Sequence, residues 1–180
     1  MSLKVATYNI HRCIGTDGRE DVGRVAAVLQ EIDAQVVGLQ EAEARPSRTS
    51  RNQAQELARR LNFELIEGPL LIEGHGHYGN ALLSRLPVRL LRRSRFGRIG
   101  LQARGFLHVE VADPDGPVWH VIATHLDLGP RARSAQLRVL ARELGLVPHP
   151  ALIMGDLNEW RGWTRALACL LYTSDAADEL

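Results

Sequence analysis

Short apolar runs separated by polar turns extend through the chain, and their period indicates the elements they form. Leu3–Asn9 alternates apolar and polar residues, which is typical of a strand. Asp21–Ile32 repeats apolar residues at helical spacing, and Asp21 is suited to cap the helix. Ala34–Gln40 is short and mostly apolar, as in a strand buried on both faces. A strand, a helix and a strand in succession predict the start of a layered α/β fold.

The middle of the chain is dominated by the shorter period of strands. After a helix expected near Asn52–Leu61, short β-like runs alternate with turn signals, the clearest of which is Asp113–Pro117. These strands are expected at Phe63–Ile66, Asn80–Ser84, Val88–Arg93, Gly105–Val111 and Trp119–Thr124. A last helix at Arg131–Leu144 and a last buried strand at Ala151–Gly155 complete the pattern.

Composition fits one globular domain with a substantial core, since the chain has 180 residues of which 45% are apolar. The net charge of +1 neither supports nor excludes a nucleic-acid substrate. No run approaches the roughly 20 apolar residues of a membrane helix, and the N-terminus lacks the layout of a secretory signal. We therefore expect a cytoplasmic monomer without a membrane segment.

Other residues that could form a metal site, a disulfide or a polyanion groove have structural explanations. Cys13 and Cys169 lack the spacing of a zinc site or a disulfide framework. The arginines between Arg85 and Arg98 could line a groove for a polyanion, but a solvated strand face is favoured. His75 and His77 lie among glycines, which favours a mobile loop over a transition-metal site.

Polar residues gather where the apolar runs end. The clusters are Asn9 with His11, Gln40 with Glu41, Thr124 with His125, and Asp156 with Asn158. A carboxylate directly after a buried strand is costly unless it is solvated, paired or bound to a cation. Glu41 and Asp156 therefore suit Mg²⁺, which prefers oxygen ligands and keeps several waters.

Each cluster also has a structural interpretation. Gln40 and Glu41 could end a strand in solvent, and Asp156 with Asn158 could form an Asx-type turn or a helix cap. A single His125 is more often structural than catalytic. The order of the clusters along the chain decides between these interpretations.

Five short motifs follow one another along the chain. They are TYNIH at 7–11, LQE at 39–41, GNALLSR at 79–85, THL at 124–126 and GDLN at 155–158. This series resembles the endonuclease/exonuclease/phosphatase superfamily, and the likeness covers about residues 3–168. The resemblance implies a DNase I-like four-layer α/β sandwich, with two mixed, mainly antiparallel sheets flanked by helices.

The resemblance also implies roles for the matching residues. Glu41 would be the principal Mg²⁺ ligand, with Mn²⁺ able to substitute. Asn9 would lie beside the metal and the scissile phosphate, and Asp156 would share the metal and activate the attacking water. Asn158 would hold the phosphate or the water shell of the metal, and His125 would donate to the phosphate.

Three further residues are weaker candidates. Asn80 and Arg104 are expected to contact the substrate phosphate, although Arg104 could equally pair with a carboxylate at the edge of the core. His11 is expected to have an outer-shell or structural role.

The C-terminal part departs from the family pattern, in which further strands and a closing Ser-Asp-His segment follow the GDLN motif. We therefore expect a family domain at 1–168 that lacks the final strands, and a tail at 169–180 like those of truncated reading frames, the alternative being a genuine short tail. On this interpretation the chain is weak or inactive as a catalyst.

The expected function is Mg²⁺-dependent hydrolysis of a phosphate ester. A phosphodiester is the favoured ester, with nucleic acid as one candidate substrate. The alternatives are a phosphomonoesterase or lipid phosphodiesterase on the same scaffold, or a non-catalytic module that binds a phosphorylated ligand. The substrate itself is not specified by motifs that unrelated activities share.

Overall fold

The computed structural model describes residues 3–97, 102–147 and 150–159. The described elements are β1 (Val5–Asn9), η1 (His11–Cys13), α1 (Val22–Ile32), β2 (Val36–Glu43), α2 (Gln53–Leu61), β3 (Glu64–Glu73), β4 (Gly76–Ser84), β5 (Val88–Arg95), β6 (Gly105–Ala112), β7 (Val118–His125), α3 (Pro130–Leu144) and β8 (Ala151–Asp156). None of the described helices has the length and apolar character needed to cross a membrane.

The strands form two sheets of four, in the orders β1-β2-β4-β3 and β5-β6-β7-β8. Each sheet contains one parallel pair. In the first, β1 runs parallel to β2 with Asn9 opposite Gln40, and in the second, β7 runs parallel to β8 with His125 opposite Asp156. A helix connects the strands of each pair, α1 in the first sheet and α3 in the second, as parallel strands require a crossover.

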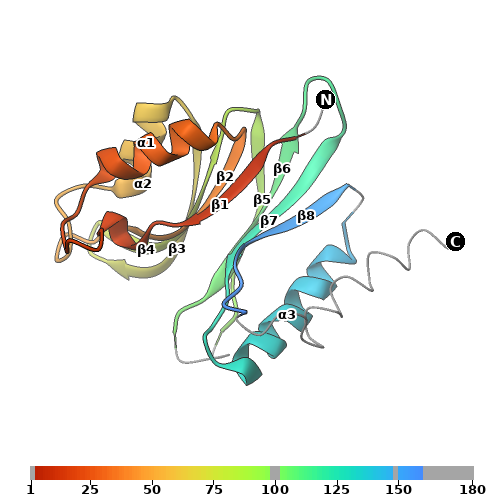
Figure 1. The fold of residues 1–180 in the computed structure, drawn as a ribbon. Helices are drawn as coiled ribbons and strands as arrows, with labels where there is room; N and C mark the ends of the chain where they lie inside the picture. The colour runs from red at the N-terminus through yellow and green to blue at the C-terminus, as the bar shows by residue number, and fades with distance from the viewer. Residues whose placement is uncertain (1–2, 98–101, 148–149, 160–180) are drawn as a thin grey trace, which may run out of the picture.

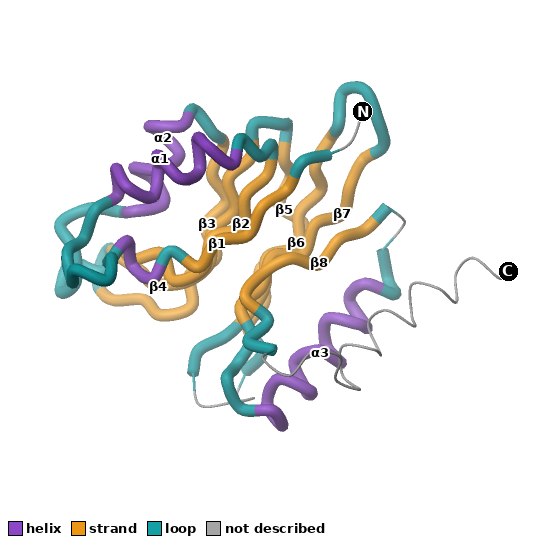
Figure 2. Tube along the Cα trace, in the orientation of Figure 1, coloured by secondary structure: helices purple, strands orange, loops and turns teal. Residues whose placement is uncertain are grey.

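The elements stack in four layers, with helices outside and the two sheets inside (Figure 1, Figure 2). Three apolar clusters fill the three interfaces between layers. One joins α1 and α2 to the first sheet through residues such as Leu29, Leu57 and Leu39. The second lies between the sheets and includes Leu82 and Leu107, and the third packs α3 on the second sheet.

Most expected elements are present, with the largest differences in the hairpin of β3 and β4. The helix cap at Asp21 is confirmed, because its carboxylate accepts from the Arg24 backbone N–H at 3.0 Å. His75 and His77 were expected in a mobile loop, but His77 lies within β4, opposite Ile72 of β3. The expected tail at 169–180 lies outside the described residues.

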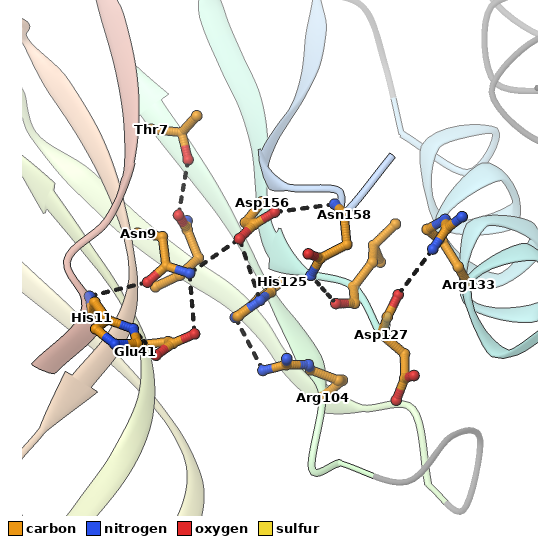
Figure 3. A network of polar contacts seen from close by, with 12 residues as sticks. Thr7, Asn9, His11, Glu41, Arg104, His125, Asp127, Arg133, Asp156 and Asn158 are labelled. Carbon is orange, nitrogen blue, oxygen red and sulfur yellow. Dashed lines mark hydrogen bonds and ion pairs between the residues drawn. The ribbon is translucent and has the colours of Figure 1, made fainter. Parts of the chain in front are cut away.

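This topology gathers the chemical side chains at one end of the sandwich. The C-terminal ends of parallel strands lie at the same edge of a sheet, which is where α/β proteins place ligands. The two sheets also bring β1 and β8 close together, so that Asn9 reaches Asp156 (Figure 1, Figure 3).

Candidate functional site

Asn9 joins the two carboxylates of the site, one from each sheet. Its amide nitrogen donates to Glu41 Oε1 at 3.1 Å and to Asp156 Oδ2 at 3.0 Å (Figure 3). Its amide oxygen accepts from the backbone N–H of His11 at 3.0 Å. Asn9 thus turns a nitrogen, which is no metal ligand, toward the carboxylates. The expected place of Asn9 beside the metal and the scissile phosphate stays a prediction.

A bulge in β2 aims the Glu41 side chain at the site. The register of β2 against β4 shifts between Leu39 and Ala42, and Glu41 has a left-handed backbone with φ 61°. Bulges often redirect side chains beside active sites. Glu41 is then held on both oxygens, by Asn9 on Oε1 and by His11 Nδ1 at 3.2 Å from Oε2.

His11 begins a turn of three residues with left-handed backbones. His11, Arg12 and Cys13 have φ values of 47°, 56° and 55°, and such conformations are unfavourable for residues other than glycine. Backbone strain of this kind is common at functional sites, where the surrounding structure enforces it. The structure brings His11 into contact with Glu41, and its expected outer-shell or structural role stays a prediction.

Asp156 ends β8, and its second oxygen is occupied as well. Oδ1 accepts from the backbone N–H of Asn158 at 3.0 Å, which is the Asx-type turn considered from the sequence. Asn158 in turn donates from its side chain to the Leu126 carbonyl at 2.8 Å. Gly155 allows β8 to approach β7 here, because a Cβ would lie 2.0 Å from the Thr124 carbonyl oxygen.

His125 lies between Asp156 and Arg104. Its Nε2 is 3.5 Å from Asp156 Oδ2, and its Nδ1 is 3.0 Å from Arg104 Nη1. Burial, followed by the Arg104 charge, lowers the pKa of His125 to about 4 against the opposing effect of Asp156. Among the described residues, Arg104 therefore contacts the His125 ring, and no ion pair with the carboxylate that the sequence allowed is found there.

Asn80 lies outside this network. It is buried in β4, and its amide nitrogen donates to the Gly105 carbonyl at 3.2 Å. The same carbonyl accepts from the Thr124 hydroxyl at 3.0 Å. Asn80 Oδ1 has no hydrogen-bond partner within the described residues. The structure therefore gives Asn80 a place between the two sheets, and its expected contact with the phosphate stays a prediction.

Gln53 and Tyr78 support residues beside the site and were not found from the sequence. Gln53 is fully buried and connects two elements, donating to the Arg12 carbonyl at 2.7 Å and accepting from the Glu43 N–H at 3.0 Å. Its sequence signal is an amide on the apolar face of a helix, beside Ala54. The pKa of Tyr78 is raised to about 12 by burial and the nearby Glu41.

The carboxylates fit a hard cation that keeps part of its water shell. Within the residues that the structure describes, no group of three or more His, Cys, Asp or Glu side chains is arranged to hold a metal ion. Glu41 and Asp156 share the single amide nitrogen of Asn9 between them. Two nearby carboxylates suit Mg²⁺, which proteins bind through one or two carboxylates and water.

Comparisons with known proteins agree with the fold and the motifs. Residues 6–171 match the model of the Endonuclease/Exonuclease/phosphatase family. The chain is 30% identical over 172 residues to "Uncharacterized protein YbhP" of Escherichia coli K12, covering 89% of this chain and 68% of that protein.

Solved structures show the same arrangement. An endonuclease/exonuclease/phosphatase from Beutenbergia cavernae is 29% identical with a TM-score of 0.69, covering 91% of this chain and 49% of that one. The chain thus spans about half the length of that protein. D. rerio TDP2 in a complex with a single-strand DNA product has a TM-score of 0.65 at 20% identity, covering 93% of this chain and 64% of that one.

These likenesses confirm the DNase I-like α/β sandwich expected from the sequence. Since the family model matches nearly all of the described chain, the protein belongs to the Endonuclease/Exonuclease/phosphatase family.

Proposed function

We propose that this protein hydrolyses a phosphodiester with the help of Mg²⁺. The observation that carries the proposal is the carboxylate pair of Glu41 and Asp156, joined by one amide nitrogen of Asn9 at 3.1 and 3.0 Å. The two carboxylates come from different sheets and lie at the ends of two parallel strand pairs. Membership of a family of nucleases and phosphatases supports this activity class.

Glu41 and Asp156 would hold the ion, with Mn²⁺ able to replace it. A bound Mg²⁺ would neutralise charge on a phosphoryl oxygen and make the phosphorus easier to attack. The residues of the chain set the position of these ligands. Asn9 and His11 fix the two oxygens of Glu41, and Asn158 fixes one oxygen of Asp156.

Asp156 is the candidate base for the attacking water. Its Oδ2 is the atom that faces Asn9 and His125, whereas Oδ1 is held by the turn to Asn158. On this proposal Oδ2 accepts a proton as the water oxygen bonds to phosphorus. The ester P–O bond breaks, and the leaving oxygen takes the bonding electron pair and then a proton from solvent water. His125 donates from Nε2 to a phosphoryl oxygen, and such donors typically contribute about 10²–10³ in rate.

Arg104 supplies the positive charge that a phosphate needs. It is only 6% exposed, and its Nε has no hydrogen-bond partner within the described residues. A buried cation is costly without an anion to pair with, so a phosphate in this place would complete its contacts. Asn80 remains a second candidate contact with the substrate, reached only if the ligand enters between the sheets.

Nucleic acid is the substrate class we favour. The structural neighbour TDP2 was solved with a single-strand DNA product, and this chain shares its fold at 20% identity. The phosphomonoesterase, the lipid phosphodiesterase and the phosphate-binding module use the same fold and stay as alternatives. A substrate panel of single-stranded DNA, RNA, a phosphomonoester and a choline phospholipid would separate them.

The proposal is tested by hydrolysis of bis-p-nitrophenyl phosphate with and without Mg²⁺. We expect weak turnover that EDTA abolishes and that Asp156→Asn reduces by at least about a hundredfold, as for the loss of a general base. Asp113→Asn, which changes a carboxylate in the turn between β6 and β7, is the matched control. Metal-independent turnover, or equal turnover in Asp156→Asn, would refute the proposal.

Titration calorimetry gives a second measurement that does not need a substrate. Mg²⁺ should bind the unmodified protein and bind the Glu41→Gln variant more weakly, because one anionic ligand is lost. A pure binding module without a metal site would show no Mg²⁺ heat at millimolar concentration.

A further inference from the structure

Arg104 lies on the Nδ1 side of the His125 imidazole and determines which ring nitrogen can donate a hydrogen bond. Arg104 Nη1 lies 3.0 Å from His125 Nδ1, and both side chains are buried, at 6% and 2% exposure. A guanidinium carries five N–H donors and no acceptor. The Nδ1 atom of His125 therefore has to accept, and the ring proton has to lie on Nε2.

We infer that Arg104 is a positioning residue for His125, because it holds Nδ1 as an acceptor and leaves Nε2–H as a fixed donor on the side of Asp156. Nε2 faces Asp156 Oδ2 at 3.5 Å (Figure 3). In the proposed function, on which this role rests, the same Nε2–H is the donor to the phosphoryl oxygen. Arg104 thus acts through His125 in addition to any direct contact with phosphate.

The charge that faces Nδ1 of His125 is opposite to the charge that faces Nδ1 in a histidine which relays protons. A base of that kind has a carboxylate behind Nδ1, which accepts the Nδ1–H and stabilises the ring as it gains a proton. Here a cation occupies that place and Asp156 lies on the other side. The arrangement suits a hydrogen-bond donor and leaves the acceptance of the water proton to Asp156.

The protein contains an internal contrast in a second buried histidine. His108 Nδ1 lies 3.1 Å from Glu143 Oε1, and His108 Nε2 lies 3.1 Å from His120 Nδ1. A carboxylate accepts, so Nδ1 of His108 has to donate. His108 and His125 should therefore have opposite ring polarity at Nδ1 because of the opposite charges that face it.

The test is the ¹⁵N NMR spectrum of the histidine rings in the metal-free protein. We expect His125 to show an unprotonated Nδ1 and a protonated Nε2, and His108 to show a protonated Nδ1. Arg104→Met should move both His125 nitrogens toward the values of a tautomer mixture, and Arg104→Lys, which keeps a donor, should restore them. The His108 signals should stay unchanged in both variants, which shows that the fold is intact.

A protonated Nδ1 on His125 in the unmodified protein would overturn the inference. An unchanged His125 spectrum in Arg104→Met with His108 in place would do so as well. These signals do not depend on turnover, so their outcome is separate from that of the proposed hydrolysis.

An activity comparison tests the role of the donor itself. His125→Gln keeps an N–H at the end of the side chain, whereas His125→Ala removes it. We expect Ala to lower kcat by about 10² or more, as for the loss of one oxyanion donor, and Gln to recover part of this loss with little change in KM. If Gln and Ala lose the same activity, His125 does more than donate a hydrogen bond, and the donor role is refuted.

Discussion

Replacing Asn9 by Asp changes one atom group at the centre of the site. The substituted carboxylate keeps the oxygen that accepts from the His11 N–H at 3.0 Å. It exchanges the amide donor for an oxygen that faces Glu41 Oε1 and Asp156 Oδ2, whose present distances to the nitrogen are 3.1 and 3.0 Å. The variant therefore tests whether a single donor holds the two carboxylates together without metal.

The expected cost follows from charge. Two like charges about 3 Å apart repel by about 5 kcal/mol at an effective dielectric constant of 20. Protonation of one carboxyl group relieves the repulsion, and holding an ordinary Asp protonated at pH 7 costs about 4 kcal/mol. We therefore expect Asn9→Asp to lower the free energy of unfolding in EDTA by about 3–5 kcal/mol at pH 7, and by much less near pH 4.

Urea denaturation at the two pH values measures this difference. Asn9→Ala, which removes the same hydrogen bonds without adding charge, is the control. Mg²⁺ should recover stability in Asn9→Asp more than in Asn9→Ala, because a cation neutralises three neighbouring carboxylates. The reasoning is wrong if Asn9→Asp is as stable as the unmodified protein in EDTA at pH 7, or if its loss does not decrease at low pH.

Three further predictions follow from buried contacts. Gln53→Leu should cost about 2–4 kcal/mol in urea denaturation, because it leaves the Arg12 carbonyl and the Glu43 N–H without partners; a neutral result would contradict the bridging role. His125 has a pKa of about 4 in the folded chain against 6.5 for an ordinary histidine. Between these pH values only the unfolded chain binds the proton, so the free energy of unfolding should fall by about 2 kcal/mol from pH 7 to pH 5. In EDTA, His125→Gln should reduce this pH dependence, and an unchanged slope would refute the assignment. Gly155→Ala should fail to fold or lose Mg²⁺ binding, since its Cβ would lie 2.0 Å from the Thr124 carbonyl oxygen; unaltered circular dichroism and Mg²⁺ titration would refute this.

The sequence by itself determined the elements and the ends of strands on which the chemistry lies. Local features are sufficient for this, because the period of apolar residues reports which face of a strand or helix is buried. Asp21 was recognised as a cap, and Glu41 and Asp156 were recognised as carboxylates following buried strands. The order of short motifs added the family and, through it, the fold.

Only the tertiary structure decided which atoms meet. Asn9 and Asp156 are 147 positions apart in the chain, and their contact depends on how β1 of one sheet packs beside β8 of the other. The bulge that turns Glu41 is likewise a property of the pairing of β2 with β4. Neither leaves a signature in the local pattern of apolar and polar residues.

The same reason explains the surprises among polar residues. Whether Arg104 faces a carboxylate or a histidine depends on the pairing of Gly105 with His125 across β6 and β7. Two arginines of β5 that could have lined a groove pair with acids of other elements, Arg89 with Glu110 of β6 and Arg92 with Glu143 of α3. Arg93 and Arg95 instead donate to the backbone carbonyls of Glu67 and Pro69. The sequence supplies the charges and their strands, whereas the partner of each charge is fixed by long-range packing.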